Sequence, residues 1–126
     1  MLKTNKVMQQ TLRMFSYNYS SAQHSRVYMD VTKDGQSAGR LVFELFDTHA
    51  PTLAENFSAF CTGQADGQRS FVGTTFDKGS TGLGIFGGDL HEEDNWGANN
   101  MRLADENLEV KHHKRGMLSM TNNGSH

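Results

Sequence analysis

The chain has 126 residues, 36% of them hydrophobic, and a formal net charge of −2 at pH 7. This length allows one domain, the composition leaves no transmembrane span, and the small net charge gives no general signal for nucleic-acid binding. The single cysteine, Cys61, excludes an internal disulfide framework.

The first 25 residues form a basic arm, because no Asp or Glu precedes Asp30. On a helical wheel Lys3, Lys6 and Arg13 lie on one side, and most apolar residues lie on the other. A basic, amphipathic, Ser-rich segment of this kind is typical of a mitochondrial presequence. We therefore expect a presequence-like arm over residues 1–25 and a mitochondrial location. A flexible tail on a cytoplasmic protein is the alternative, and the sequence leaves open whether the arm is cleaved or docks on a neighbouring protein.

Two strands joined by a tight turn are predicted after the arm. Apolar residues alternate with polar ones from Val27 to Thr32, and Asp34-Gly35 is a common pair in hairpin turns. The second strand covers Arg40–Phe46. Both of its faces are mostly apolar, as expected for a strand that is buried on two sides or rolled into a barrel.

A short helix is predicted over Pro51–Thr62. Pro51 suits the first helical turn, where a missing N–H costs nothing, and Gly63 is placed to end the helix. Apolar residues recur at helical spacing and include Cys61, which favours a buried thiol over a reactive one. Because so short a helix is marginal alone, it must cap an apolar surface.

The rest of the chain predicts weaker elements. Residues 71–76 are β-branched and aromatic and indicate a third strand. Residues 83–86 form a weak fourth strand, and Gly87-Gly88 marks a bend or a close approach of backbone. Residues 108–110 and 116–120 together predict one more strand and its entry.

No cofactor or metal site is predicted. His91–Asp94 and His112–His113 carry metal-ligand atoms, but each is a single cluster in a polar segment, which is more often a solvated surface. The basic run Lys111–Arg115 is too short to predict a nucleic-acid interface.

Four separated stretches occur in the same order as motifs of the cyclophilin family, the cyclophilin-type peptidyl-prolyl cis-trans isomerases. Residues 40–63 resemble its GR-x-x-FELF, P-x-T-x-ENF and Thr-Gly pattern, and residues 75–89 resemble its F-H-R to Q-G-G-D segment. Asp105–Asn107 resembles its D-E-N, and Gly116–Met120 its G-x-L-S-M. Residues 26–126 therefore resemble the N-terminal part of a cyclophilin domain.

The resemblance implies a mainly β fold: a partial antiparallel cyclophilin-like β-barrel with one capping α-helix. The remaining strands and second helix of the family pattern are absent, so edge strands and part of the core would stay uncovered. We expect partners that cover the open edge, either other subunits of a large assembly or a chain that supplies the C-terminal half. The residues expected in or beside the core are Leu41, Phe43, Leu45, Phe57, Phe76, Leu118 and Met120.

The resemblance also implies a site, and this sequence departs from it. Lys78 matches the family's catalytic Arg, which polarises the prolyl peptide bond, and Asp77 is an acid that could pair with it. Lysine keeps the charge but loses the planar fork of a guanidinium. Gly84 replaces an apolar pocket residue, and Phe86 replaces a hydrogen-bonding Gln. The substrate-binding positions fall on Phe76, Leu83, Phe86 and Asn122.

These departures predict a catalytically degenerate cyclophilin-like domain that serves as a structural or accessory subunit of a large mitochondrial complex. The alternative is a peptidyl-prolyl cis-trans isomerase whose site is completed by another chain or by further C-terminal residues.

Overall fold

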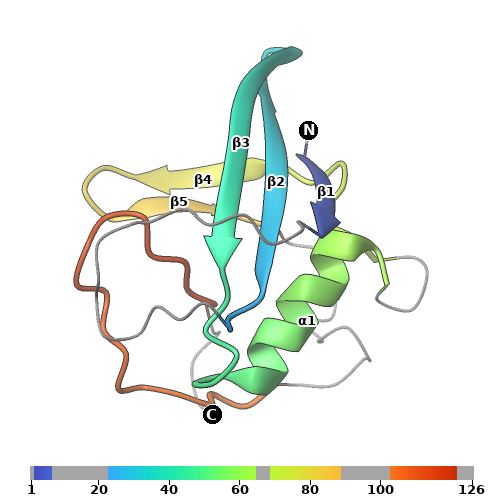
Figure 1. Cartoon of the computed structure of the whole chain (residues 1–126). Helices are drawn as coiled ribbons and strands as arrows, with labels where there is room; N and C mark the ends of the chain where they lie inside the picture. The colour runs from blue at the N-terminus through green and yellow to red at the C-terminus, as the bar shows by residue number, and fades with distance from the viewer. Residues whose placement is uncertain (1, 7–22, 65–68, 89–102, 122–126) are drawn as a thin grey trace.

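The computed structural model describes residues 2–6, 23–64, 69–88 and 103–121. These residues are mainly β, as predicted, and the strands form two antiparallel sheets, ordered β1-β2-β3 and β4-β5, rather than one closed barrel (Figure 1). In the described ranges, no helix has both the length and the apolar character that crossing a membrane requires. The elements are β1 (Leu2–Lys6), β2 (Arg26–Lys33), β3 (Gln36–Glu44), α1 (Pro51–Thr62), β4 (Phe76–Ser80) and β5 (Gly84–Gly87).

The predicted hairpin is confirmed, and its tip projects beyond the rest of the molecule (Figure 1). Asp34 and Gly35 have φ values of 51° and 77°, the positive angles that let a two-residue turn follow the twist of its strands. β3 begins earlier than predicted and stops at Glu44 instead of Phe46. The chain turns there because the Asp47 N–H donates to the Leu45 carbonyl at 2.9 Å.

The helix is confirmed with the predicted bounds. Pro51 lies in its first turn, and Gly63 ends it in the left-handed conformation, with φ of 70°. The N-cap residue, Ala50, has no side chain that can accept from the first N–H groups. Glu106 performs this role from a distant segment, accepting from the N–H of Thr52 at 3.1 Å and of Leu53 at 2.8 Å.

The described core lies between α1 and the lower part of the β1-β2-β3 sheet. Phe57 is central to it, since its ring lies 5.8 Å from that of Phe43 and 5.2 Å from that of Phe71. The core prediction is confirmed for Leu45 and Phe57, and Phe43 packs against the core while partly buried. The buried apolar residues are Val27, Met29, Leu45, Ala54, Phe57, Phe60, Cys61 and Phe71.

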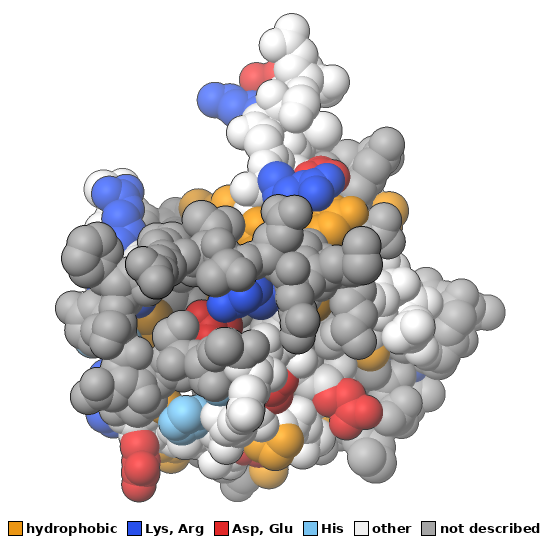
Figure 2. Space-filling model, in the orientation of Figure 1, with side chains coloured by type: hydrophobic (Ala, Val, Ile, Leu, Met, Phe, Trp, Pro, Cys, Tyr) orange, Lys and Arg blue, Asp and Glu red, His pale blue; other side chains and the backbone are white. Residues whose placement is uncertain are grey.

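Four residues that were expected in or beside the core are exposed. Leu41 is 41% exposed, Phe76 37%, Leu118 47% and Met120 51%. The core cluster joins α1 to Val27 and Met29 of β2 and to Leu45, just after β3, and these four residues lie outside it. Hydrophobic side chains also gather at the base of the projecting hairpin (Figure 2). The described part therefore has a core that is closed on its α1 side and open elsewhere.

Two predicted elements are wrong. Residues 71–75 form a turn, because Gly73 has φ of +86° and the Thr74 N–H and hydroxyl both donate to the Phe71 carbonyl. No strand forms over residues 108–110 or 116–120, where the Asn107 side chain instead accepts from the N–H groups of Glu109 and Val110. Leu2–Lys6 is a strand paired with β2 and not a helical turn, so the helical wheel does not describe that part of the arm.

Candidate functional site

The predicted site residues gather on the β4-β5 hairpin. Phe76 opens β4, Lys78 lies two residues further on, and Phe86 lies opposite Lys78 in the antiparallel register. A register shift between Phe76 and Lys78 leaves Asp77 as the extra residue of a β-bulge. Bulges re-aim the side chains that flank them. The structure therefore brings these residues together on one hairpin, in which each strand has only the other as a partner in the described part.

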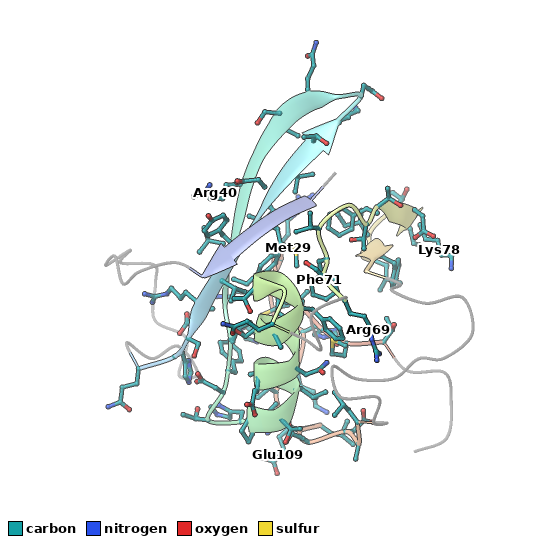
Figure 3. The ribbon with its side chains drawn as sticks, turned by 90° about the vertical axis from the view of Figure 1, so that its right-hand side faces the viewer. Met29, Arg40, Arg69, Phe71, Lys78 and Glu109 are labelled. Carbon is teal, nitrogen blue, oxygen red and sulfur yellow. The ribbon has the colours of Figure 1, made fainter. Side chains whose placement is uncertain are left out.

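Lys78 is exposed, and its side chain projects from the outer side of β4, away from α1 (Figure 3). Within the described residues no ion pair joins it to Asp77, so the structure does not contain the pairing that the sequence suggested. Phe86, its cross-strand neighbour, is half-buried. A cross-strand pair on one face of a sheet has its Cβ atoms about 5 Å apart, so the Lys78 and Phe86 side chains leave the hairpin from neighbouring positions.

The apolar side chains around this pair face solvent. Leu83, in the turn between the strands, is 77% exposed, and Ile85 on β5 is 66% exposed. Gly84, between them, has nothing within 4 Å of the position that a Cβ would take. The described part therefore offers an apolar ridge and not a walled cup for a proline ring. Asn122, the remaining predicted substrate-binding residue, lies outside the described residues.

Two glycines mark close approaches of backbone, as predicted at Gly87-Gly88: Gly87 lies against the start of β4, and Gly88 lies against the core residue Phe71. A Cβ on Gly87 would lie 2.6 Å from the Thr75 carbonyl oxygen and 2.8 Å from the Phe76 ring. A Cβ on Gly88 would lie 2.9 Å from the ring of Phe71. Phe71 lies between α1 and the hairpin (Figure 3). The backbone at Gly87, which ends β5, and at Gly88, just after it, thus packs directly on aromatic rings, and a side chain at either position would force its neighbours to move.

Sequence reasoning missed a polar junction at the start of β2. The buried imidazole of His24 lies 3.0 Å from the Glu44 carboxylate through Nδ1 and 2.8 Å from the Thr48 hydroxyl through Nε2. The Ser25 hydroxyl and N–H donate to one carboxylate oxygen of Asp47 at 2.6 and 3.0 Å. The hydrogen bond from the Ser25 hydroxyl is the largest effect that lowers the pKa of Asp47. The junction ties β2 to the turn after β3, and no local sequence pattern signals it.

The chemistry available on this hairpin is limited to one cation and an aromatic surface. Prolyl isomerisation forms no covalent bond with the protein and proceeds over a barrier of about 18–20 kcal/mol by rotation of the amide. A protein lowers that barrier by aiming a fixed donor at the twisted amide in a dry site. Lys78 supplies a charge on a flexible stem in an exposed position, which is a weaker form of that donor. No group of three metal-ligating side chains is assembled among the described residues.

The comparisons with known proteins agree with the motifs. The model of the cyclophilin type peptidyl-prolyl cis-trans isomerase/CLD family matches residues 28–126. The peptidyl-prolyl cis-trans isomerase CYP21-1 of Arabidopsis thaliana is 36% identical over 108 residues, which cover 79% of this chain and 48% of the relative. The E3 SUMO-protein ligase RanBP2 of Homo sapiens is 38% identical over 101 residues, 78% of this chain and 3% of that protein.

The chain thus spans about half the length of the Arabidopsis relative. No solved structure is significantly similar to it. The family match includes the whole β4-β5 hairpin and all of the candidate site residues. The chain belongs to the cyclophilin family.

Proposed function

We propose that this chain is a cyclophilin-like interaction subunit whose isomerase site is degenerate. The observation that carries the proposal is the pair formed by Lys78 and Phe86 across β4 and β5. The family's guanidinium position holds an ammonium, and the neighbouring hydrogen-bonding position holds a phenyl ring. A phenyl ring neither donates a conventional hydrogen bond nor accepts one from a peptide as an amide does.

The exposed ridge of Leu83 and Ile85 supports the interaction role. Side chains of this size are costly to leave in water, about 1.5–3 kcal/mol for each that a partner buries fully. β3 also lacks a strand partner on its outer edge among the described residues. An exposed apolar ridge and an open strand edge each suit permanent association with another protein segment.

We propose that this partner is another protein subunit of the assembly, which covers the ridge and the open edge of β3. The support is the exposure of Leu83 and Ile85 and, within the described residues, the lack of a strand partner on the outer edge of β3. We also propose a mitochondrial location, on the composition of the basic arm. The complex would be a large one in which the chain is an accessory component.

The test compares ridge variants of the tagged full-length chain in cells. We expect the unaltered chain to fractionate with mitochondria, in an assembly much larger than its 14.0 kDa. Leu83→Ser/Ile85→Ser removes the ridge and should lower the assembled fraction at least about tenfold, since 1.4 kcal/mol of lost burial is sufficient. Thr81→Ala, in the same exposed turn, is the matched control. A cytosolic monomer, or equal assembly of both variants, contradicts the proposal.

The alternative function is prolyl isomerisation. Its specific support is the identity of the Arabidopsis relative, a peptidyl-prolyl cis-trans isomerase. In that case a completing segment would wall the exposed ridge and desolvate Lys78. Desolvation strengthens the interaction of an ammonium with a carbonyl oxygen, so Lys78 would then act as the electrostatic group.

A further inference from the structure

A basic turn, residues 111–116, lies in the segment that Glu106 anchors to α1 (Figure 1). Lys111, Lys114 and Arg115 of this turn are all exposed. The sequence has no Asp or Glu from residue 110 to residue 120. Three positive charges are therefore gathered on one short stretch of surface, in a chain whose net charge is −2.

The backbone shapes this stretch into a turn without a helix or a strand. The His113 N–H donates to the Lys111 carbonyl at 2.9 Å, and Nδ1 of the same histidine lies 2.9 Å from that oxygen. Gly116 has φ of +87°, a conformation that glycine adopts without steric cost, and it bends the chain directly after Arg115. These local contacts leave the basic side chains at the surface.

An exposed aliphatic side chain lies beside the basic turn. Leu108 is 70% exposed. The Lys111 ammonium donates to the Leu108 carbonyl at 2.8 Å, which brings the charge next to this residue. The one acid between them, Glu109, is exposed, and its N–H donates to the Asn107 side chain. Cations and an apolar group thus reach solvent from adjoining positions.

We propose that the basic turn and Leu108 dock on the surface of a membrane that contains anionic phospholipids. Lys and Arg are attracted to the phosphates of such a surface, and an aliphatic side chain enters the boundary between head groups and acyl chains. A nucleic acid also presents phosphates but has no apolar layer for Leu108. Three cations and one leucine give a reversible contact and not a permanent anchor.

The first experiment measures sedimentation of the full chain with phosphatidylcholine vesicles that contain about 30% phosphatidylserine, an anionic lipid. Lys114→Gln/Arg115→Gln should weaken binding about 25-fold, because each Lys or Arg near an anionic surface contributes about 1 kcal/mol, or about fivefold. Arg26→Gln/Lys33→Gln is the matched control, since it removes two charges from β2, and it should bind nearly as the unaltered chain does.

The second experiment measures the contribution of the apolar group. Leu108→Ser should weaken binding to the same vesicles about tenfold, since about 1.4 kcal/mol of lost burial is sufficient. Val72→Ser, at an aliphatic residue that is 51% exposed, is the matched control and should bind unchanged. Added salt screens the charges, so it should shrink the effect of Lys114→Gln/Arg115→Gln and leave the effect of Leu108→Ser.

Other anionic partners are separated by a third probe, a short DNA duplex at the same phosphate concentration. We expect the chain to bind the vesicles at least about tenfold more tightly than the duplex, a difference that about 1.4 kcal/mol of burial of Leu108 gives. Equal binding to both, or an unchanged affinity for the vesicles in Leu108→Ser, overturns the membrane assignment. Equal binding to vesicles with and without phosphatidylserine overturns the proposal as a whole.

The folding of each variant is verified by the buried thiol of Cys61, which should stay protected from alkylation as in the unaltered chain. If the double variant fails this check, Lys114→Gln and Arg115→Gln are measured singly, and each should weaken vesicle binding about fivefold. The proposal does not rest on the proposed function, because the ridge of Leu83 and Ile85 belongs to a different segment. Loss of assembly through that ridge and loss of vesicle binding are therefore separate outcomes.

Discussion

The carboxylate of Glu106 accepts a 2.8 Å hydrogen bond from the backbone N–H of Leu53, more than fifty residues earlier in the chain. Its second oxygen accepts from the Thr52 N–H. Both donors lie in the first turn of α1, where N–H groups have no partner inside the helix. The contact therefore caps the helix and anchors the segment of residues 103–121 to it.

Glu106→Gln should destabilise the fold by about 1 kcal/mol, because a neutral amide oxygen replaces a charged acceptor at a helix N-terminus. Thermal or urea unfolding of the two chains at pH 7 measures this loss. Glu109→Gln, an exposed acid in the same segment, is the matched control and should change stability little. Equal destabilisation by both substitutions would show that the cap contributes nothing specific.

The cap should also depend on pH. Burial raises the pKa of Glu106, but the hydrogen bonds from Thr52 and Leu53 outweigh it, so the pKa lies below its ordinary 4.5. A depressed pKa in the folded state means that the stabilisation is present above about 4.5 and is lost as the pH falls through the folded value. The difference in unfolding free energy between the unaltered chain and Glu106→Gln should shrink over that range, and a constant difference would rule out this origin.

Two glycines of β5 provide a matched pair of substitutions. Gly87→Ala should destabilise by about 1–3 kcal/mol, since the new methyl would lie 2.6 Å from the Thr75 carbonyl oxygen. Gly84→Ala meets open space in the same strand and should be neutral or stabilising by up to about 1 kcal/mol. Urea unfolding distinguishes them, and similar effects of the two changes would contradict the packing of β5 on Phe76.

The buried thiol of Cys61 reports on the integrity of the core. Burial raises its pKa to about 12, and the residue has no exposed surface. At pH 8 the folded chain should react with iodoacetamide at least about 1,000-fold more slowly than the unfolded chain, whose thiol has a pKa near 8.5. Rapid alkylation without denaturant would mean that the core of α1 and β2 opens readily when the chain is alone.

Elements with strong local signals could be predicted from the sequence. Asp34-Gly35 supplies both positive φ angles of its turn, and Pro51 with Gly63 delimits α1, so these bounds follow from backbone chemistry alone. The same reasoning failed over residues 71–75. There β-branched and aromatic composition suggested a strand, but the Phe71 N–H is donated to the Phe60 carbonyl and Gly73 turns the chain.

The sequence identified the positions of the candidate site but did not predict their solvent exposure or their contacts. The order of motifs singled out Phe76, Lys78 and Phe86 as site positions, and the structure brings them onto one hairpin. Their exposure depends on which elements cover the hairpin, and that is a tertiary property with no local signature. The roles of Glu106 and His24 likewise depend on contacts across more than twenty residues, which periodicity does not encode.

The most direct measurement of the central claim is the rate at which the native assembly isomerises a proline-containing peptide. The account predicts the uncatalysed relaxation, over tens to hundreds of seconds at 25 °C, with the unaltered chain and with Lys78→Ala alike. An acceleration by the unaltered assembly that Lys78→Ala abolishes would contradict the degenerate site and make Lys78 the electrostatic group of an active isomerase.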